Sequence, residues 1–464
     1  IAENTLQAVY ITGGVAVCVD FCVFSGLTTA AAGAAIATTS AATLFVSNTT
    51  FTACATTSET SSVNGGAVSV NQASAKAYYS GCVFEGCSAG YGAGAICGYT
   101  RIDGCHFENC TAKKGGGGAL AKNVLADPVV SNCTFVANAL TDSAAGYSGG
   151  AVWVGNDTVF EECTFRTNTS EKTLGALYAS GGEITLRRCK FYGNSAASGY
   201  GAASGVATVE DCIFEENKTD SSDAGALGAT YSKGPARVVR TVFRGNAALN
   251  GHGGAIYVNN KTNLFVSACS FVGNTNVYNS CGGAIYANQS WLEVRNSLFA
   301  KNYTGHKGPS AIDVNKDKAN SALIENCSFV SNVVNATVGG HGVLNKTAGI
   351  FAVTNCIFYS NIDLLNHAIC NFYSSQDLAG FGYCASDDDK LKDLTGCLKL
   401  TKYPFASGDD FRLRRHAEPV DKGLPLPWMT ADSLDAYGLP RVSQLIPDIG
   451  ACERQIKGLM LQVR

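Results

Sequence analysis

The chain has 464 residues, a net charge of −3 and only 15% charged residues. This balance gives no basic surface, so we exclude nucleic acid as a partner. Twenty cysteines and twelve Asn-x-Ser/Thr sequons instead predict passage through an oxidising, glycosylating pathway, and hence a secreted, extracellular or cell-surface glycoprotein.

The N-terminal region predicts short strands and no membrane span. Residues 8–21 read AVYITGGVAVCVDF, which is strand-like and leaves little room for an N-terminal cap. Residues 21–58 carry no charge but are rich in Ala, Thr and Ser and are interrupted by Gly33. Such weak hydropathy predicts soluble coils rather than a transmembrane helix.

From residue 20 to residue 370 one unit recurs about every 28 residues. Nine clear copies run from CTFVAN at 133–138 to CIFYSN at 356–361, and degenerate copies centre on Phe24, Phe51, Phe84 and Phe107. An apolar residue usually stands three positions before the Cys, so the unit reads Φ-x-x-C-x-F-x-x-N. Cys and Phe alternate and therefore share one face of a short strand.

A second motif lies between these copies, as in HGGAIYVNN at 252–260 and CGGAIYANQ at 281–289. It supplies another strand, and the polar pairs before Cys and before Asn predict tight corners. No 3.6-residue period persists, which excludes a helical solenoid. Three short strands in each repeat predict a parallel β-helix of about 13 coils, because stacked coils share a core that no single coil could bury.

The alternation of GGA-Ile/Leu/Val and FxxN resembles the repeats of the polymorphic outer-membrane proteins of chlamydiae. SLDAYGLPRVSQLIPDIGACE at 433–453, with DDFRLRRHAEPVDKG at 409–423 before it, resembles the closing segment of secreted right-handed β-helix proteins. The resemblance implies an all-β, right-handed parallel β-helix at residues 1–371 and a C-terminal capping or docking segment at 372–464. It also implies a surface or adhesive function.

The repeated Asn and Cys positions predict ladders along the axis of the β-helix. Stacked Asn side chains can hydrogen-bond from coil to coil and satisfy corner backbone groups. The predicted Asn ladder consists of Asn138, Asn168, Asn194, Asn217, Asn246, Asn274, Asn302, Asn332 and Asn361. Stacked Cys residues are either buried thiols or axial disulfides. The disulfide candidates are Cys133 with Cys163, Cys189 with Cys212, and Cys384 with Cys397.

Several other residues are candidates for glycosylation, ligand binding or the core. The sequons outside the ladder are candidates for glycosylation: Asn132, Asn156, Asn260, Asn288 and Asn326. Four aromatic residues follow a strand aliphatic and are predicted to point outward, where they could stack on sugars or on a protein: Trp153, Tyr178, Tyr257 and Tyr286. His341 and His367 are predicted to stack inside the core. No Cys–His spacing indicates zinc, and we predict no metal and no cofactor.

Three functions are compatible with this sequence. The first is an extracellular structural protein that assembles head-to-tail into filaments through its sheet edges, with residues 372–464 docking on the next subunit. The second is a monomeric glycan-binding adhesin. The third is a polysaccharide lyase or hydrolase. Enzymes of that kind need clustered carboxylates with Arg or Lys nearby, and no such cluster is visible in the sequence, which favours a non-enzymatic role.

Overall fold

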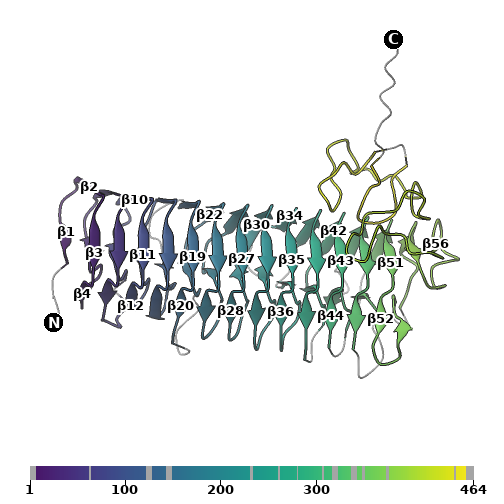
Figure 1. The fold of residues 1–464 in the computed structure, drawn as a ribbon, viewed down its shortest axis with the longest axis horizontal. Coiled ribbons are helices and arrows are strands. Elements are labelled where there is room, and N and C mark those ends of the chain that lie inside the picture. Colours follow the sequence, from purple (N-terminus) through teal and green to yellow (C-terminus); the bar gives the residue numbers. More distant parts are fainter. Residues whose placement is uncertain are drawn as a thin grey trace, which may run out of the picture.

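The computed structural model describes residues 7–455, except for 62–63, 122–127, 143–148, 230–233, 260–261, 279–280, 306–307, 316–321, 336–341, 347–350, 373–375 and 444–445. The described chain winds into a straight rod with its first coils at one end and the C-terminal segment at the other (Figure 1). Parallel strands stack from coil to coil throughout the rod. The fold is the predicted right-handed β-helix.

Each coil contains four strands, one more than the sequence predicts. Strands in equivalent positions form four sheets of 13, 14, 15 and 14 strands, here called sheets A, B, C and D. The first coil comprises β1 Val9–Ile11, β2 Ala16–Asp20, β3 Val23–Ser25 and β4 Thr28–Thr29. The last four-stranded coil comprises β49 Leu344–Lys346, β50 Phe351–Thr354, β51 Ile357–Tyr359 and β52 Ile362–Asp363. The unpredicted strand is the short one of sheet D, which follows the Asn corner.

Four consecutive coils carry the site discussed below. They are β33 Leu227–Ala229, β34 Ala236–Val239, β35 Val242–Arg244 and β36 Ala247–Ala248; β37 Ile256–Val258, β38 Leu264–Ser267, β39 Ser270–Val272 and β40 Thr275–Asn276; β41 Ile285–Asn288, β42 Leu292–Arg295, β43 Leu298–Ala300 and β44 Tyr303–Thr304; and β45 Ile312–Asn315, β46 Ala322–Glu325, β47 Ser328–Val330 and β48 Val333–Val334.

Both corners of the Cys–Phe–Asn unit use one residue in the left-handed backbone region. In the coil of β38 these residues are Ala268, with φ of 53°, and Gly273, with φ of 65°. A single left-handed residue turns the chain sharply between two extended strands. The side chains on either side of it, such as Val266 and Cys269, can then both point into the core.

Two continuous ladders run through the core, among buried aliphatic and Cys side chains. The Phe residues of sheet C stack from Phe24 to Phe358, with ring centroids 4.6–5.2 Å apart. The Asn ladder runs from Asn138 to Asn361, and all nine of its side chains are fully buried. In each interior step, a backbone N–H and an amide of one Asn donate to the side-chain oxygen of the next, as from Asn217 to Asn246 at 3.1 and 3.0 Å.

The Cys ladder contains thiols and no disulfide, because all twenty cysteines are free. Of the two alternatives that the sequence left open, buried thiols are therefore found, and the candidate pairs Cys133–Cys163, Cys189–Cys212 and Cys384–Cys397 are not bonded. In-register parallel strands direct both side chains of a pair the same way, so the sulfurs stack and do not turn toward each other as a disulfide requires. The backbone N–H of Cys189 instead donates to the sulfur of Cys212 at 3.3 Å, and Cys384 does the same to Cys397 at 3.3 Å.

The parallel pairing continues past residue 371. The short strands β54 Phe381–Gly382, β55 Ala385–Ser386 and β56 Leu398–Lys399 extend sheets B and C. Residues 400–455, here called the C-terminal segment, then lie against the outside of the last coils (Figure 1). Their own apolar cluster includes Phe405, Phe411 and Ile449, packed on the outward residues Leu298 and Val330.

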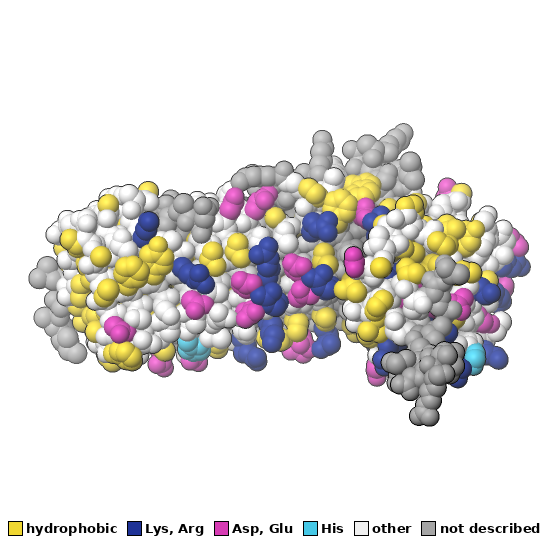
Figure 2. Space-filling view, turned by 90° about the horizontal axis from the view of Figure 1, so that it is seen from above, with side chains coloured by type: hydrophobic (Ala, Val, Ile, Leu, Met, Phe, Trp, Pro, Cys, Tyr) yellow, Lys and Arg dark blue, Asp and Glu magenta, His cyan; other side chains and the backbone are white. Residues whose placement is uncertain are grey.

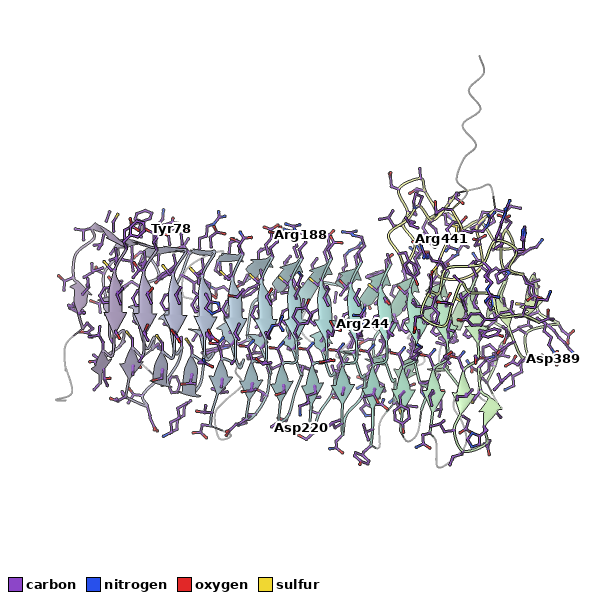
Figure 3. The ribbon with its side chains drawn as sticks, in the orientation of Figure 1. Tyr78, Arg188, Asp220, Arg244, Asp389 and Arg441 are labelled. Carbon is purple, nitrogen blue, oxygen red and sulfur yellow. The ribbon has the colours of Figure 1, made fainter. Side chains whose placement is uncertain are left out.

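The C-terminal segment is organised around a buried arginine. Arg441 is fully buried and lies within the segment (Figure 3). Its guanidinium donates to the carbonyls of Asp448 and Gly450. The segment is attached to the rod by hydrogen bonds such as Ala451 N–H to Ser328 Oγ at 2.9 Å. It therefore covers the side of the rod and creates new surface where its edge meets the bare coils.

Candidate ligand-binding cleft

The predicted outward aromatic residues do not form an exposed stacking face. Tyr257 and Tyr286 are only 7% and 4% exposed. They point out of the coil as predicted, but the His252 ring stacks on Tyr286 at 4.3 Å and Tyr200 leans over Tyr257. Trp153 and Tyr178 are half-buried. Residues at the turns of sheet A thus cover the aromatic pair. The alternation of side chains along a strand predicts that the two rings point outward, but it cannot predict that other residues cover them.

The predicted glycosylation sites differ in accessibility. Asn132 is exposed, whereas Asn156 and Asn288 are half-buried and Asn260 lies outside the described residues. Asn326 was predicted to face outward, but it is fully buried beneath the C-terminal segment, against Asn355 and Arg441. For the histidines, His341 lies outside the described residues. His367 is exposed, which contradicts its predicted core position.

We expect glycopeptide mass spectrometry of the folded protein from a glycosylating host to find glycan on Asn132 and none on Asn217 or Asn326. A glycan cannot be placed inside a close-packed coil or beneath a docked segment. Full occupancy of Asn217 would contradict its position in the ladder.

Charged side chains gather along the middle of the sheet B face of the rod, next to the C-terminal segment (Figure 2). Most of these charges are paired across neighbouring coils. Arg188 pairs with Glu161 and Glu162, and Arg240 pairs with Glu210 and Asp211. Exposed pairs of this kind contribute little to stability individually, roughly 0–1 kcal/mol each. The charges become functionally interesting where they reach the cleft described next.

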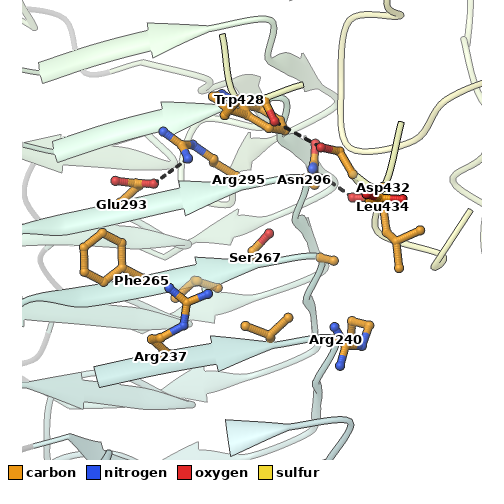
Figure 4. Close-up of a pocket in the computed structure, with 14 residues that line it drawn as sticks. Arg237, Arg240, Phe265, Ser267, Glu293, Arg295, Asn296, Trp428, Asp432 and Leu434 are labelled. Carbon is orange, nitrogen blue, oxygen red and sulfur yellow. Dashed lines mark hydrogen bonds and ion pairs between the residues drawn. The ribbon is translucent and has the colours of Figure 1, made fainter. Parts of the chain in front are cut away.

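A cleft of about 290 Å³ lies where the C-terminal segment meets the outer face of sheet B (Figure 4). Its floor is formed by β34, β38 and β42, and its wall by residues 428–434. Val238, Val266 and Val294 of these strands point into the core, so the alternate residues point into the cleft. The outward residues are Arg237, Val239, Phe265, Ser267, Glu293 and Arg295.

Arg295 connects the floor of the cleft to its wall. Its Nε donates to Glu325 Oε2 at 2.8 Å, and its NH1 lies 2.9 Å from Glu293 Oε1. The guanidinium lies over the Trp428 ring, 4.9 Å from the centroid, and Trp428 Nε1 donates to the same Glu325 oxygen at 2.6 Å. These contacts fix the positions of one aromatic ring and one carboxyl group before any ligand arrives.

The carboxyl group on the floor of the cleft belongs to Glu293, and its surroundings shift its pKa. Burial raises the pKa of the Glu293 carboxyl above its ordinary value, and the neighbouring Arg295 opposes that rise only in part. The Glu293 side chain is 13% exposed and faces the cleft. The carboxyl oxygens of Glu293 that face the cleft can accept hydrogen bonds from ligand hydroxyl groups.

The two remaining arginines of the cleft differ in their partners. Arg240 Nε donates to Asp211 Oδ1 at 2.7 Å, and its guanidinium also contacts Glu210. Arg237 is exposed, and no ion pair to it forms among the residues that the structure describes. Arg237 can therefore bind an anionic ligand without first giving up an ion pair to any of the described residues.

Aromatic rings border the same floor. The Phe265 ring contacts Trp291 edge to face, with centroids 5.3 Å apart, and Trp428 stands on the opposite wall. All three rings are half-buried, so part of each remains accessible. Within the described part of the chain, no group of His, Cys, Asp and Glu is arranged to hold a metal ion. The lining of the cleft thus combines arginine, carboxyl and aromatic side chains, the carboxyl groups being those of Glu293 and Asp432.

The sequence analysis did not predict this cleft, although the repeat pattern contains the residues of its floor. Arg237, Phe265 and Glu293 occupy one register position in consecutive coils, and their outward direction follows from the inward Val residues beside them. The wall residue Trp428, on the C-terminal segment, shares no repeat pattern with the coils. Nothing in the sequence places it next to Arg295.

Comparisons with known proteins agree with this fold and do not assign the cleft. A family model described as a right-handed beta helix region matches residues 66–234. The chain is also 27% identical over 280 residues to a metabotropic glutamate receptor-like protein R of Dictyostelium discoideum. That match covers 53% of this chain but only 16% of the relative. No helix among the described residues is long and apolar enough to cross a membrane. The stacked parallel sheets and the match over residues 66–234 together show a right-handed β-helix fold built from repeats.

Proposed function

We propose that this chain is an extracellular β-helix module that binds an acidic saccharide, one bearing carboxylate or sulfate groups, in the cleft beneath the C-terminal segment. The observation that carries the proposal is Arg237, an exposed guanidinium without an ion-pair partner among the described residues, in a preformed cleft. A guanidinium binds carboxylate and sulfate groups through two parallel hydrogen bonds.

The other groups of the cleft favour a saccharide over a simple anion. Accessible parts of the Phe265 and Trp428 rings can pack against the apolar face of a sugar. Glu293 and Ser267 can exchange hydrogen bonds with sugar hydroxyls. A surface location is supported by the sequons and by the likeness to a receptor-like protein, which together favour an adhesin-like binding role.

Calorimetric titration with acidic oligosaccharides tests the proposal. We expect Arg237→Ala to weaken binding about tenfold or more, because a charge-assisted hydrogen bond contributes about 1.5–3 kcal/mol. Arg101→Ala is the matched control, since Arg101 is exposed and occupies the same register position five coils away. The affinities of uronate, sulfated and neutral oligosaccharides of equal length are compared. The comparison shows whether the cleft prefers carboxylate or sulfate groups, and whether it needs a charged ligand.

Three results would overturn the proposal. One is equal binding of neutral and acidic oligosaccharides, and another is equal loss in the Arg101 and Arg237 variants. The third is tighter binding of an acidic peptide of the same charge, which would make the ligand a protein. Mass spectrometry of the recovered oligosaccharide also distinguishes binding from cleavage and so tests the lyase or hydrolase alternative.

Head-to-tail assembly stays a prediction from the sequence. The C-terminal segment packs on the side of the coils through residues such as Phe411 and Ile449, so it offers this prediction no added support. Light scattering of the intact chain that detected only monomers at high concentration would reject filament formation. It would leave the binding proposal untouched.

A further inference from the structure

A second cleft, of about 390 Å³, adjoins the first on the neighbouring face of the rod. Its floor is the outer face of sheet C, formed by β35, β39 and β43. Its wall is again the edge of the C-terminal segment, here Asp409, Phe411, Ala436 and Tyr437. The same three coils and the same edge therefore border both clefts.

The two clefts meet at the corner between sheets B and C. Arg240, Ala268 and Asn296 are the left-handed corner residues and line the first cleft. The second cleft begins two residues later in each coil, at Val242, Ser270 and Leu298. On the wall, Leu434 lines the first cleft and Ala436 the second. The continuous lining indicates one groove that runs around the rod, perpendicular to its axis.

An unsatisfied acceptor marks the point where the groove turns. Asn296 is 2% exposed, and its Nδ2 donates to the Leu434 carbonyl at 2.8 Å. Among the described residues, no donor reaches its Oδ1. A buried polar atom without a partner costs roughly 1–3 kcal/mol. A ligand hydroxyl group would reach this oxygen only after the Asn296 side chain had moved, because the oxygen is buried.

The second cleft offers an apolar platform with cations at its edges. Tyr437 is 42% exposed, with the Arg412 guanidinium 5.9 Å from its ring centroid, and Val272 lies half-buried on β39. Arg244 and Lys301 are exposed, and within the described part of the chain they pair with Glu215 and Asp409, respectively. Exposed pairs are weak, so either cation can turn to an anionic ligand at little cost.

We infer that the groove binds one extended acidic oligosaccharide of several residues. Its first acidic group lies on Arg237, the chain crosses the corner at Asn296, and later sugars lie on Tyr437 and Val272. This inference rests on the proposed function and adds the length and path of the ligand. Pockets for small ligands measure roughly 300–1,000 Å³, so each cleft alone corresponds to a short ligand and the two together to a longer one.

The test compares galacturonate oligomers of two and six units by calorimetry with the intact chain. We expect the hexamer to bind at least about tenfold more tightly than the dimer. Val272→Glu and Tyr437→Ala should abolish that gain and leave dimer binding within about twofold of the wild type. Tyr437→Phe keeps the ring and should keep the gain. Val136→Glu is the matched control, because Val136 occupies the register position of Val272 in a distant coil.

The control variants separate a real second subsite from trivial effects. A longer ligand can occupy a single subsite in more ways, which by itself raises its apparent affinity. An increase of that kind would remain in the Val272→Glu variant. The extended groove would be rejected if dimer and hexamer bound with equal affinity, or if both second-cleft variants kept the higher affinity for the hexamer. Either result would leave the proposal for the first cleft intact. Absence of binding at every length, with no effect of Arg237→Ala, would instead reject the proposed function itself.

Discussion

Asn246→Ala is expected to lower the free energy of unfolding by about 2–6 kcal/mol, because it leaves at least two buried backbone groups without partners at about 1–3 kcal/mol each. The Asn246 Nδ2 donates to the Phe214 carbonyl at 2.9 Å, and its Oδ1 accepts the Asn217 backbone N–H at 3.1 Å. Alanine can replace neither contact. The corner is fully buried, so water does not reach these groups without opening the coil.

Urea denaturation of the variant measures this loss, with Asn263→Ala as the control. Asn263 is an exposed Asn just before β38, and its removal should change stability by no more than about 0.5 kcal/mol. A loss below about 1 kcal/mol for Asn246→Ala would mean that water can replace the side chain at the corner. The ladder would then be a consequence of the repeat and would not be needed to hold the corners.

The repeat made the coil predictable because its chemistry is periodic. Every Cys–Phe–Asn unit places two apolar residues and one amide in the same register, and stacking is the arrangement that buries all of them. The corners were predicted for the same reason. Their left-handed residues could not have been identified individually, since residues as different as Ala268, Glu216 and Thr167 occupy that conformation.

The fourth strand and the disulfides show where pattern reading stops. Thr275–Asn276 is a strand of two residues, too short to show an alternation of apolar and polar side chains. The repeat spacing correctly places the Cys residues of neighbouring coils next to each other. A disulfide also requires the two side chains to turn toward each other, and in-register parallel strands point them in the same direction. The fourth strand and the choice between thiol and disulfide both depend on local geometry that residue spacing does not encode.

The cleft and the cover over Asn326 were unpredictable for a different reason. Each depends on where the C-terminal segment docks, and that is decided by contacts such as Trp428 with Glu325, 103 residues apart in the sequence. Only the floor residues belong to the repeat. A non-repetitive segment packed on a repetitive surface gives a few coils a cleft, although these coils otherwise resemble their neighbours.

Phe271→Ala is expected to destabilise the protein by about 3–5 kcal/mol, through lost burial and the cavity that remains. The Phe271 ring is fully buried and stacks between Phe243 at 4.9 Å and Phe299 at 4.7 Å. Continuous backbone ladders on both sides hold the neighbouring rings at their coil spacing. The cavity therefore cannot collapse, which places the cost toward the upper part of the range.

Equilibrium unfolding should show a much smaller loss for Phe265→Ala, the matched aromatic residue on the outer face of β38. Phe265 is half-buried, and its removal opens a surface depression that water can fill. Phe191→Ala should cost about as much as Phe271→Ala, since Phe191 stacks between Phe165 and Phe214 at 4.6 and 4.7 Å. In a solenoid each coil contacts only its neighbours, so equal surroundings give equal costs. A clearly larger cost at Phe271 would show that the C-terminal segment, packed over these later coils, couples its own docking to the order of the core beneath it.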